Sequence, residues 1–309
     1  MTVEAMHLFH QDIISINQFS KEEILQILQM TQELGHYHDP ELLRGCILGS
    51  CFFEPSTRTR LSFESAMTRL GGNVIGFSDG LTTSQAKGES LHDTLKMMEH
   101  YADVIVIRHP SEGAAQWAAD VSTIPVINAG DGSNQHPTQT LLDLFSILET
   151  QGRLENLSIA LAGDLKHGRT THSLAQALAH FNPRLYFISP PSLEMPKSIC
   201  DLLRQKGVKF SFHSAIDEVL PKVDLFYMTR IQEERFSDRR EYDHVKECFC
   251  LHADMLFPCK ENMKILHPLP RVKEIHPSVD ATPHAYYFQQ AGNGVLVRKT
   301  LLRLLLRKI

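Results

Sequence analysis

The sequence predicts an α/β protein of two domains, each a parallel sheet with helices on both faces. Short apolar runs alternate with segments of helical spacing along the chain, a pattern typical of parallel strands linked by helices. The 309 residues suggest two domains, at about 150 residues for each. Hydrophobic residues make up 42% of the chain and charged residues 22%, as in ordinary globular proteins, which argues against disordered, collagen-like and coiled-coil classes.

The first half of the chain alternates predicted helices and strands. Ser20 is a candidate N-cap of the first helix, and Gly71 and Gly72 end the second. The helices are expected at residues 21–34, 56–70, 90–101, 113–120 and 136–150. The strands are expected at residues 46–53, 73–77, 104–107 and 124–127. The helix at 136–150 is apolar nearly all round, which predicts a helix buried on several sides, as between two domains.

The second half continues the alternation without an internal sequence repeat. Strands are expected at residues 157–162, 185–188, 208–212, 223–227 and 264–266. Helices are expected at residues 169–180, 197–205, 215–220 and 283–306, the last with a weak point at Gly292-Asn293-Gly294. The helix at 136–150 thus separates a first predicted domain, at residues 1–135, from a second set of strands and helices that follows it.

Charge and cysteine usage narrow the class of protein. The net charge of −5, from 31 Lys and Arg against 36 Asp and Glu, argues against nucleic-acid or anionic-membrane partners. No apolar run approaches the ~18 residues of a membrane-spanning helix, and the first 20 residues lack a basic leader. The six cysteines have no paired spacing, which favours a reduced cytoplasmic enzyme. Cys248, Cys250, His252 and Cys259 lack the spacing of structural zinc, so we expect packing and no metal site there.

A dense group of hydroxyl and arginine side chains follows the first predicted strand. The segment Phe-Glu-Pro-Ser-Thr-Arg-Thr-Arg occupies residues 53–60, and Ser56 or Thr57 can cap the following helix. The helix start then presents backbone N–H groups and arginines, a combination that binds dianions such as phosphate. A capped helix with surface arginines is the alternative, but it does not account for this density. The glycine and lysine frame of a P-loop is absent.

Two further segments place candidate residues at strand ends. Arg108 follows a buried strand, where it either reaches a ligand or only reaches solvent. Pro137 fits the first position of the helix at 136–150, so His136 and Gln139 lie about one turn apart at its start. A neutral histidine there can donate a hydrogen bond to a carbonyl oxygen, although capping of the helix is the alternative.

Arginines also follow strands in the second half of the chain. Arg169 opens a helix shortly after Gly163 and Asp164, and Arg230 follows the strand at 223–227. The segment His-Pro-Leu-Pro-Arg at residues 267–271 contains two prolines, which make the loop extended and rigid. Each segment alone could be a surface turn. Several arginines at strand ends in a chain of net charge −5 predict a ligand with several negative charges.

Together these segments closely resemble the catalytic chains of the bacterial aspartate carbamoyltransferase family, from about Ser56 to Arg298. The motifs that carry the resemblance are Ser-Thr-Arg-Thr-Arg, Arg-His-Pro, His-Pro-Thr-Gln-Thr, Gly-Asp-Leu-Lys-x-Gly-Arg-Thr, Met-Thr-Arg-x-Gln and His-Pro-Leu-Pro-Arg. Ornithine carbamoyltransferases share the phosphate and carbonyl motifs. They resemble one another in a His-Cys-Leu-Pro loop, where this chain has His267-Pro268-Leu269-Pro270, so the resemblance favours aspartate as the acceptor.

The resemblance assigns a ligand to each predicted domain. It implies a carbamoyl phosphate-binding domain at residues 1–135, completed by a C-terminal helix at about residues 285–309. It also implies an interdomain helix at 136–150 and an aspartate-binding domain at 151–284. The residues implied to hold the phosphate are Ser56, Thr57, Arg58 and Thr59. Thr59, Arg108 and His136 are implied to contact the carbonyl oxygen of carbamoyl phosphate, and Gln139 to orient its nitrogen.

On the amino-acid side, the resemblance implies binding to cations and backbone groups. The residues implied to bind aspartate are Lys87, Arg169, Arg230, Gln232, Leu269 and Pro270, with the Leu269 backbone near the amine. Ser84 and Lys87 lie in a loop that, in members of this family, contributes to the active site of a neighbouring subunit. The resemblance therefore implies a homotrimer with shared active sites. The spacing from Ser84 to Lys87 is one residue shorter than in enteric members, which leaves the role of Ser84 open. The residues implied to be catalytic are Arg58, Thr59, Lys87, Arg108 and His136.

The implied reaction is transfer of the carbamoyl group from carbamoyl phosphate to the amine of L-aspartate, an early step of pyrimidine biosynthesis. No Ser–His–acid or Cys–His set stands out in these loops, so we expect direct attack by the amine, without a cofactor or a metal. Regulatory chains or dihydroorotase in a larger assembly stay open. Three alternatives also stay open: a carbamoyltransferase for another amine, a catalytically silent homologue and a dinucleotide-binding oxidoreductase. The third alternative is disfavoured because Gln135 replaces the third glycine of the dinucleotide-binding fingerprint.

Overall fold

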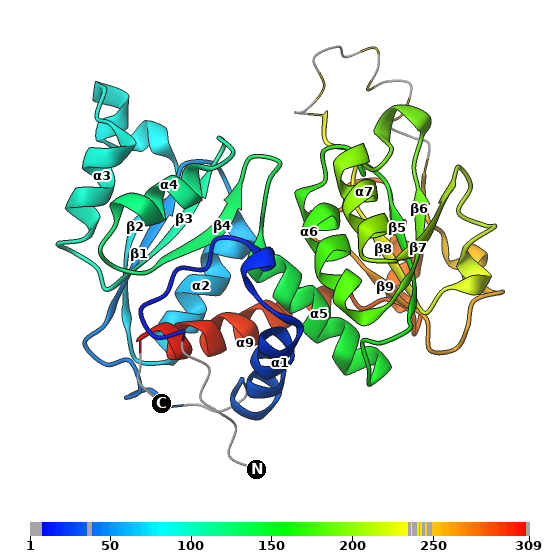
Figure 1. Cartoon of the computed structure of the whole chain (residues 1–309), viewed down its shortest axis with the longest axis horizontal. Helices are drawn as coiled ribbons and strands as arrows, with labels where there is room; N and C mark the ends of the chain where they lie inside the picture. Colours follow the sequence, from blue (N-terminus) through cyan, green and yellow to red (C-terminus); the bar gives the residue numbers. More distant parts are fainter. Residues whose placement is uncertain are drawn as a thin grey trace. The chain divides into compact units, whose positions relative to one another are not determined.

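The computed structural model describes residues 8–306 apart from 36–38, 234–235, 237–239, 241, 243–244 and 246–248. The chain forms two compact units (Figure 1). Unit 1 comprises Met1–Leu142 and Gly292–Ile309, and unit 2 comprises Asp143–Ala291. Each unit contains a parallel sheet with helices packed on it, so the predicted α/β class is confirmed.

The sheet of unit 1 is parallel and has the strand order β2-β1-β3-β4. Its strands are β1 (Ile47–Phe52), β2 (Asn73–Phe77), β3 (Val104–His109) and β4 (Val126–Asp131). Its helices are α1 (Lys21–Leu34), α2 (Thr57–Arg69), α3 (Leu91–Met98) and α4 (Ala114–Val121). From β1 the chain moves toward one edge of the sheet to form β2, and it then moves toward the opposite edge to form β3 and β4. Right-handed crossovers therefore place α2 on one face of the sheet, and α3 and α4 on the other face. Leu95 of α3 and Ala115 of α4 accordingly pack in one core with Ile105 and Ile107 of β3.

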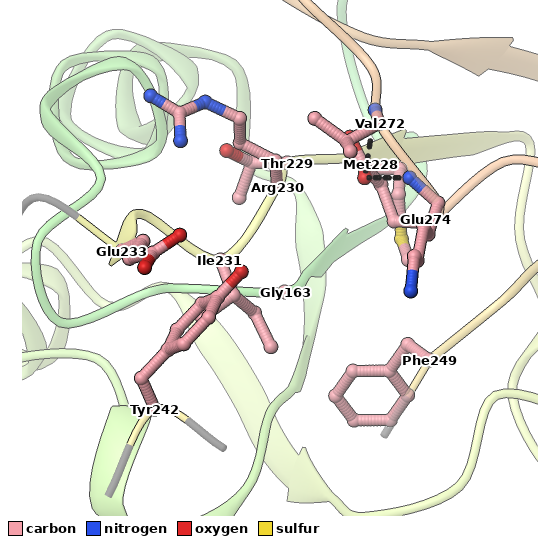
Figure 2. Close-up of a pocket in the computed structure, with 11 residues that line it drawn as sticks. Gly163, Met228, Thr229, Arg230, Ile231, Glu233, Tyr242, Phe249, Val272 and Glu274 are labelled. Carbon is pink, nitrogen blue, oxygen red and sulfur yellow. Dashed lines mark hydrogen bonds between the residues drawn. The ribbon is translucent and has the colours of Figure 1, made fainter. Parts of the chain in front are cut away.

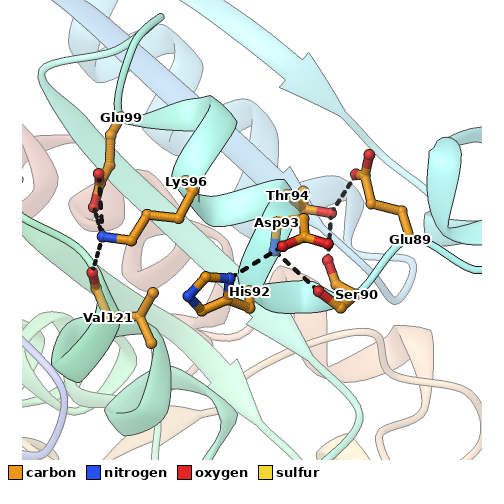
Figure 3. Close-up of polar contacts among 8 residues, drawn as sticks. All are labelled: Glu89, Ser90, His92, Asp93, Thr94, Lys96, Glu99 and Val121. Atoms are coloured by element: carbon orange, nitrogen blue, oxygen red, sulfur yellow. Dashed lines mark hydrogen bonds and ion pairs between the residues drawn. The ribbon is translucent and has the colours of Figure 1, made fainter.

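Helix α3 is anchored by polar contacts at both ends (Figure 3). At its start, the backbone N–H of Asp93 donates to the hydroxyl of Ser90 at 3.1 Å. Near its end, Lys96 Nζ donates to the carbonyl of Val121, the last residue of α4, at 2.6 Å. A cation at the C-terminal end of a helix also interacts favourably with the helix dipole. These contacts hold the helix that directly follows the loop of residues 80–88.

The sheet of unit 2 is also parallel and has the strand order β7-β6-β5-β8-β9. Its strands are β5 (Ser158–Ala162), β6 (Arg184–Ile188), β7 (Lys209–His213), β8 (Leu225–Met228) and β9 (Lys264–Leu266). Its helices include α6 (Arg169–Leu178) and α7 (Lys197–Gln205). These two helices connect strands in the same direction, so right-handed crossovers place both on one face. A second core, which includes Phe226, Met228 and Tyr287, lies on the sheet.

Two helices belong to both units. Helix α5 (Pro137–Gln151) passes into unit 2 after Leu142, and α9 (Tyr287–Leu306) returns to unit 1 at Gly292. Helix α9 continues through the glycine segment, where the sequence predicts a weak point. A Cβ at Gly294 would lie 2.5 Å from the guanidinium of Arg298 and 3.1 Å from Leu142, so this glycine allows close packing within unit 1.

The helix predicted at residues 215–220 is wrong. The backbone N–H groups of Val219 and Leu220 both donate to the carbonyl of Ile216, which forms a turn, and a short 3₁₀ segment follows at Leu220–Lys222. Pro221 has no N–H and cannot continue an α-helix from this turn. The segment is also too short to form a second helical turn, whose hydrogen bonds would offset the unfavourable free energy of helix nucleation.

Each sheet contains a point where the connections leave two neighbouring strands in opposite directions. In unit 1 the chain leaves β1 toward β2 and β3 toward β4, and Phe52 and Arg108 pair at the carboxyl end of β1 and β3. In unit 2 the loops after β5 and β8 diverge in the same way. Ligands of open α/β sheets bind outside the carboxyl ends of strands at such switch points. Functional residues are therefore expected in the loops after β1, β3, β5 and β8.

The amino end of the unit 2 sheet is held by a buried carboxylate, Asp224, directly before β8. Its Oδ2 accepts the backbone N–H of Ser158 at 2.9 Å, and its Oδ1 accepts from Lys260 Nζ at 2.8 Å. Burial acts to raise the pKa of this carboxyl. The hydrogen bonds from Lys260 and Ser158 outweigh burial and hold the pKa below its usual value.

We expect Asp224→Asn to destabilise the protein by an amount that depends on pH. A carboxyl with a lower pKa in the folded state stabilises the fold above its unfolded pKa, near 4, and this contribution is lost as the pH falls through the folded pKa. The free energy of unfolding should therefore fall by about 1–2 kcal/mol at neutral pH, and the difference from wild type should shrink in acid. Denaturant unfolding of both proteins at neutral pH and at about pH 3 measures this, and an unchanged difference contradicts it.

Candidate active site

The start of α2 presents the dense hydroxyl and arginine segment at the carboxyl end of β1. Ser56 is the N-cap residue, and its hydroxyl makes no capping hydrogen bond to the helix backbone. Thr57 and Arg58 are exposed, whereas Thr59 is buried. Arg60 points along the helix, with Nη1 3.6 Å from Oε1 of Glu64. The helix start therefore offers backbone N–H groups and hydroxyls for an anion, with Arg58 as the exposed cation.

Arg108 lies beside this helix start, at the switch point of unit 1. Its Nη2 lies 2.7 Å from Oε1 of Glu54, and its Nη1 donates to the carbonyl of Ala129 at 3.2 Å. The backbone carbonyl of Arg108 accepts the N–H of Phe53 at 2.8 Å. These contacts tie the ends of β1, β3 and β4 together and orient the guanidinium at the carboxyl end of the sheet.

The loop that leads to His136 is organised by the buried carboxylate of Asp131. This carboxylate accepts the side-chain amides of Asn128 and Asn134 at 2.9 and 3.0 Å. It also accepts the backbone N–H groups of Gly113 at 2.9 Å and Gln135 at 3.1 Å. Four donors on one carboxylate hold the chain tightly after β4. The position of the next residue, His136, is set by this hydrogen-bonded loop.

His136 and Gln139 flank the first turn of α5, and both are buried. The backbone N–H of Gln139 donates to the carbonyl of His136 at 3.0 Å, as expected for residues one turn apart. Arg298 of α9 packs behind this turn, since it donates to Ser62 of α2 at 2.7 Å and to Thr138 at 3.4 Å. One buried guanidinium therefore links the second turn of α2 to the first turn of α5, and these two helices carry candidate residues of unit 1.

Ser84 and Lys87 lie in the loop between β2 and α3. They begin and end the 3₁₀ helix Ser84–Lys87, and both side chains are exposed. The start of this loop lies close to the end of β1, because a Cβ at Gly80 would be 3.3 Å from the ring of Phe53. The structure thus presents Ser84 and Lys87 on the surface of unit 1.

In unit 2, Asp164 connects the two loops at the switch point. Its fully buried carboxylate accepts the backbone N–H of His167 at 3.0 Å and that of Gln232 at 3.4 Å. The first contact shapes the turn before α6, which Arg169 opens. The second holds the segment after β8. Gly163 is required here, because its φ is +110° and a Cβ would lie 2.0 Å from the carbonyl of Thr229.

Arg230 and the end of β8 line a pocket at the carboxyl end of the unit 2 sheet. In Figure 2 Arg230, Glu233 and Tyr242 lie on one side of the view, and Val272, Glu274 and Phe249 lie on the other. The guanidinium of Arg230 points away from Phe249. The structure therefore places a cation and a carboxylate from different loops around one pocket.

Leu269 and Pro270 lie on the loop after β9, which is held by hydrogen bonds to residues of unit 2. The backbone N–H of Leu269 donates to Nδ1 of His267 at 2.8 Å, and the peptide bond to Pro270 is cis. The last motif residue, Arg271, donates to Asp280 at 2.6 Å and to the hydroxyl of Tyr287 at 3.0 Å. This guanidinium holds the pKa of the Asp280 carboxyl below its usual value. Arg271 therefore stabilises the loop through contacts within unit 2.

The predicted residues thus gather at the carboxyl ends of adjacent strands within each unit. In unit 1 the loops after β1, β3 and β4 carry Ser56, Thr57, Arg58, Thr59, Arg108, His136 and Gln139. In unit 2 the loops after β5, β8 and β9 carry Arg169, Arg230, Gln232, Leu269 and Pro270. Neighbouring parallel strands place these segments together although they lie far apart in the sequence.

Two family models together match nearly the whole chain. Residues 11–149 match "Aspartate/ornithine carbamoyltransferase, carbamoyl-P binding domain", and residues 155–305 match "Aspartate/ornithine carbamoyltransferase, Asp/Orn binding domain". The chain is 55% identical to the aspartate carbamoyltransferase catalytic subunit of Chromobacterium violaceum, over 97% of this chain and 99% of that protein. The chain belongs to the aspartate/ornithine carbamoyltransferase family.

Solved members of this family have the same fold. The catalytic subunit of M. jannaschii aspartate transcarbamoylase superposes with a TM-score of 0.87 at 48% identity, covering 95% of this chain and 97% of that one. Aspartate transcarbamoylase from Trypanosoma cruzi, in complex with carbamoyl phosphate and aspartate, superposes with a TM-score of 0.90 at 37% identity, covering 97% and 96%. The predicted membership of this family is confirmed.

Some polar residues that the structure places at the site had no role predicted from the sequence. Asp131, Asp164 and Glu274 are buried carboxylates that hold the site loops, and Glu54 pairs with Arg108. A signal was present for the first two, because each acid follows a glycine at a strand end, where such residues are typical of tight hydrogen-bonded turns. For Glu54 and Glu274 the sequence alone contains no comparable signal.

The described part of the chain contains neither a candidate metal-binding cluster nor a candidate membrane-spanning helix. Its His, Cys, Asp and Glu side chains nowhere form a group of three or more that could hold a metal ion. Cys248, which the sequence analysis assigns to packing, lies outside the described residues. Among the same described residues, none of the helices combines the length and apolar character needed to cross a bilayer.

Proposed function

We propose that this protein transfers the carbamoyl group of carbamoyl phosphate to the amine of L-aspartate, giving N-carbamoyl-L-aspartate and phosphate. The observation that carries the proposal is the concentration of arginines with hydroxyl and amide groups at the switch points of both sheets. One set suits a phosphate dianion and the other suits carboxylates. The related Trypanosoma cruzi enzyme with both substrates bound supports the same pair of ligands. The reaction is an early step of pyrimidine biosynthesis.

Unit 1 is assigned to carbamoyl phosphate. Ser56, Thr57, Arg58 and Thr59 hold the phosphate through the start of α2. The carbonyl oxygen accepts from Thr59, Arg108 and His136, and Gln139 orients the carbamoyl nitrogen. The match of residues 11–149 to a carbamoyl-P binding domain supports this assignment. The sequence-based boundaries of 1–135, 136–150 and 151–284 stay predictions.

Unit 2 is assigned to aspartate. Arg169, Arg230 and Gln232 bind its two carboxylates, and the backbone of Leu269, next to Pro270, lies near its amine. The match of residues 155–305 to an Asp/Orn binding domain supports an amino-acid ligand in this unit. Arginine forms forked, charge-assisted bonds with carboxylates, so two of them suit a dicarboxylic acid better than the cationic side chain of ornithine.

The chemistry follows from the residue types. The aspartate amine attacks the carbamoyl carbon, a C–N bond forms, and a tetrahedral oxyanion develops on the former carbonyl oxygen. Donors at Thr59, Arg108 and His136 stabilise this charge. The C–O bond to phosphate then breaks, and the leaving phosphate takes the amine proton. No protein nucleophile takes part, and binding both anions in one site contributes through proximity.

The protein is further proposed to be a homotrimer with shared active sites. In this arrangement Ser84 and Lys87 of one subunit complete the site of the next, with Lys87 also binding aspartate. The exposed 3₁₀ helix Ser84–Lys87 and the neighbouring Leu81, which is 80% exposed, support a role in subunit contact. The Chromobacterium violaceum relative is called a catalytic subunit, which supports further chains in a larger assembly. A cytoplasmic location stays a prediction from the sequence.

The choice of amino acid is the first test. We expect the wild type to carbamoylate L-aspartate and to leave ornithine unreacted. Arg230→Ala should raise the KM for aspartate about 10- to 100-fold, because a charge-assisted bond to a carboxylate is lost. Product formation at varied aspartate concentrations, with saturating carbamoyl phosphate, measures this.

Arg204 provides the control for this variant. It is an exposed arginine of unit 2, on α7, paired with Asp201 at 2.6 Å. Arg204→Ala should leave the KM for aspartate unchanged. Ornithine as the better acceptor would overturn the proposed function, and an unchanged KM in Arg230→Ala would remove Arg230 from the site.

The oxyanion donors are the second test. We expect His136→Ala to lower kcat by about 100- to 1,000-fold, as is typical of removing one such donor. The KM for carbamoyl phosphate should change much less, because the phosphate contacts remain. Steady-state kinetics measures both constants, and thermal unfolding checks that the variant folds. A kcat near that of wild type contradicts the proposed role.

The shared site is the third test. Sedimentation should give three times the mass of one chain. Arg58→Ala and Lys87→Ala should each be nearly inactive, since each removes a cation from every site. Their co-expression should restore activity, because random trimers contain intact sites at roughly a quarter of positions. A trimer without any recovery would show that Lys87 does not act across the interface.

A further inference from the structure

His267 is buried in unit 2, at 1% exposed, and its ring joins two parts of the loop after β9. The backbone N–H of Leu269 donates to Nδ1 at 2.8 Å. On the other side of the ring, Nε2 lies 2.7 Å from Oε1 of Glu274. Because Nδ1 accepts a hydrogen bond, it carries no proton in the neutral ring. Nε2 is therefore the nitrogen that donates to the carboxylate.

The second oxygen of Glu274 holds the far side of the same loop. Oε2 accepts the backbone N–H groups of Val272 at 3.1 Å and Lys273 at 3.0 Å (Figure 2). Burial acts to raise the pKa of this carboxyl. The hydrogen bonds from His267 and from the backbone outweigh burial and hold the pKa below its usual value. The carboxylate thus remains charged at neutral pH and keeps accepting from Nε2.

The backbone of Leu269 depends on this support. Its φ is +56°, in the left-handed region that residues with a Cβ rarely adopt. Such a conformation persists only where the surrounding contacts over-determine it. The hydrogen bond to Nδ1 of His267 is a contact of this kind.

The same loop is tied to the end of β8 by a buried chain of hydrogen bonds. The backbone N–H of His267 donates to Oε1 of Gln290 at 2.8 Å. Gln290 Nε2 donates to Asp143 at 2.7 Å, and the hydroxyl of Tyr227 donates to the other oxygen of Asp143 at 2.9 Å. Tyr227 belongs to β8, which leads directly to Arg230. The backbone at Leu269 and the segment of Arg230 are therefore anchored to one network.

We propose that His267 is a positioning residue for the amine of aspartate, acting through the hydrogen bond from the Leu269 N–H to its Nδ1. The inference rests on the proposed function, in which the Leu269 backbone lies near that amine. Glu274 acts one step further away. By accepting from Nε2 it keeps the proton on that nitrogen and leaves Nδ1 as an acceptor.

Two substitutions separate the two sides of the ring. In His267→Asn the side-chain oxygen takes the place of Nδ1 and can accept the N–H of residue 269, as in an Asx-turn, but the contact with Glu274 is lost. In His267→Gln the longer side chain takes the place of Nε2 and can donate to Glu274, but the acceptor for Leu269 is lost.

We expect the two variants to rank in opposite orders for binding and for stability. His267→Gln should raise the KM for aspartate about tenfold, and His267→Asn should raise it less than about threefold. His267→Asn should nevertheless unfold at the lower temperature, because it leaves the buried carboxylate of Glu274 without its donor. In both variants the KM for carbamoyl phosphate should stay within about twofold of wild type, since the candidate residues for that ligand lie in unit 1.

Asp224→Asn is the matched control. It alters another buried carboxylate of unit 2, which accepts from Lys260 and from the backbone N–H of Ser158, but at the amino end of the sheet. It should reduce stability and leave the KM for aspartate unchanged. If the KM follows stability, so that His267→Asn is the worse variant on both measures, His267 has only a structural role and the inference falls. A wild type that does not carbamoylate aspartate would instead overturn the proposed function.

Discussion

The candidate site depends on one constraint of parallel sheets, the divergence of loops at a switch point. In unit 1 the connections leave β1 and β3 in opposite directions, and in unit 2 they leave β5 and β8 in opposite directions. Side chains at these carboxyl ends meet no following helix directly above them, so they remain available to a ligand. Arg108 and Arg230 both occupy such positions. Strand order therefore decides which arginines can serve a ligand and which cannot.

Buried carboxylates then hold each loop in the geometry that the switch point permits. Asp131 holds the loop before His136, Asp164 joins the loops after β5 and β8, and Glu274 holds the loop after β9. A buried carboxylate is tolerated only where donors surround it, and here backbone N–H groups supply many of them. Hydrogen bonds within the protein therefore order these loops. Such preorganisation lets the candidate donors act without rearranging during the reaction.

Most elements follow from local pattern, and the exceptions have identifiable causes. The helix predicted at 215–220 became a turn because Pro221 cannot continue a helix and the segment is too short. Gly292 and Gly294 lie within a continuous helix, and the absence of a side chain at Gly294 lets Arg298 and Leu142 pack closely against it. In each case a covalent or packing constraint outweighed propensity. The candidate arginines were predictable because each follows a short apolar run that predicts a strand.

By itself the sequence determined the α/β class, the alternation of strands and helices, and the arginines and hydroxyls at strand ends, since these follow from local periodicity and spacing. Only the tertiary structure decided which carboxylates hold the loops. Glu54 pairs with Arg108, 54 residues later in the sequence, and Gln290 hydrogen-bonds to Asp143, 147 residues earlier. Such pairings depend on strand order and burial, which no local pattern encodes. The support of Leu269 by His267 is local in sequence, yet only its backbone conformation shows that the support is required.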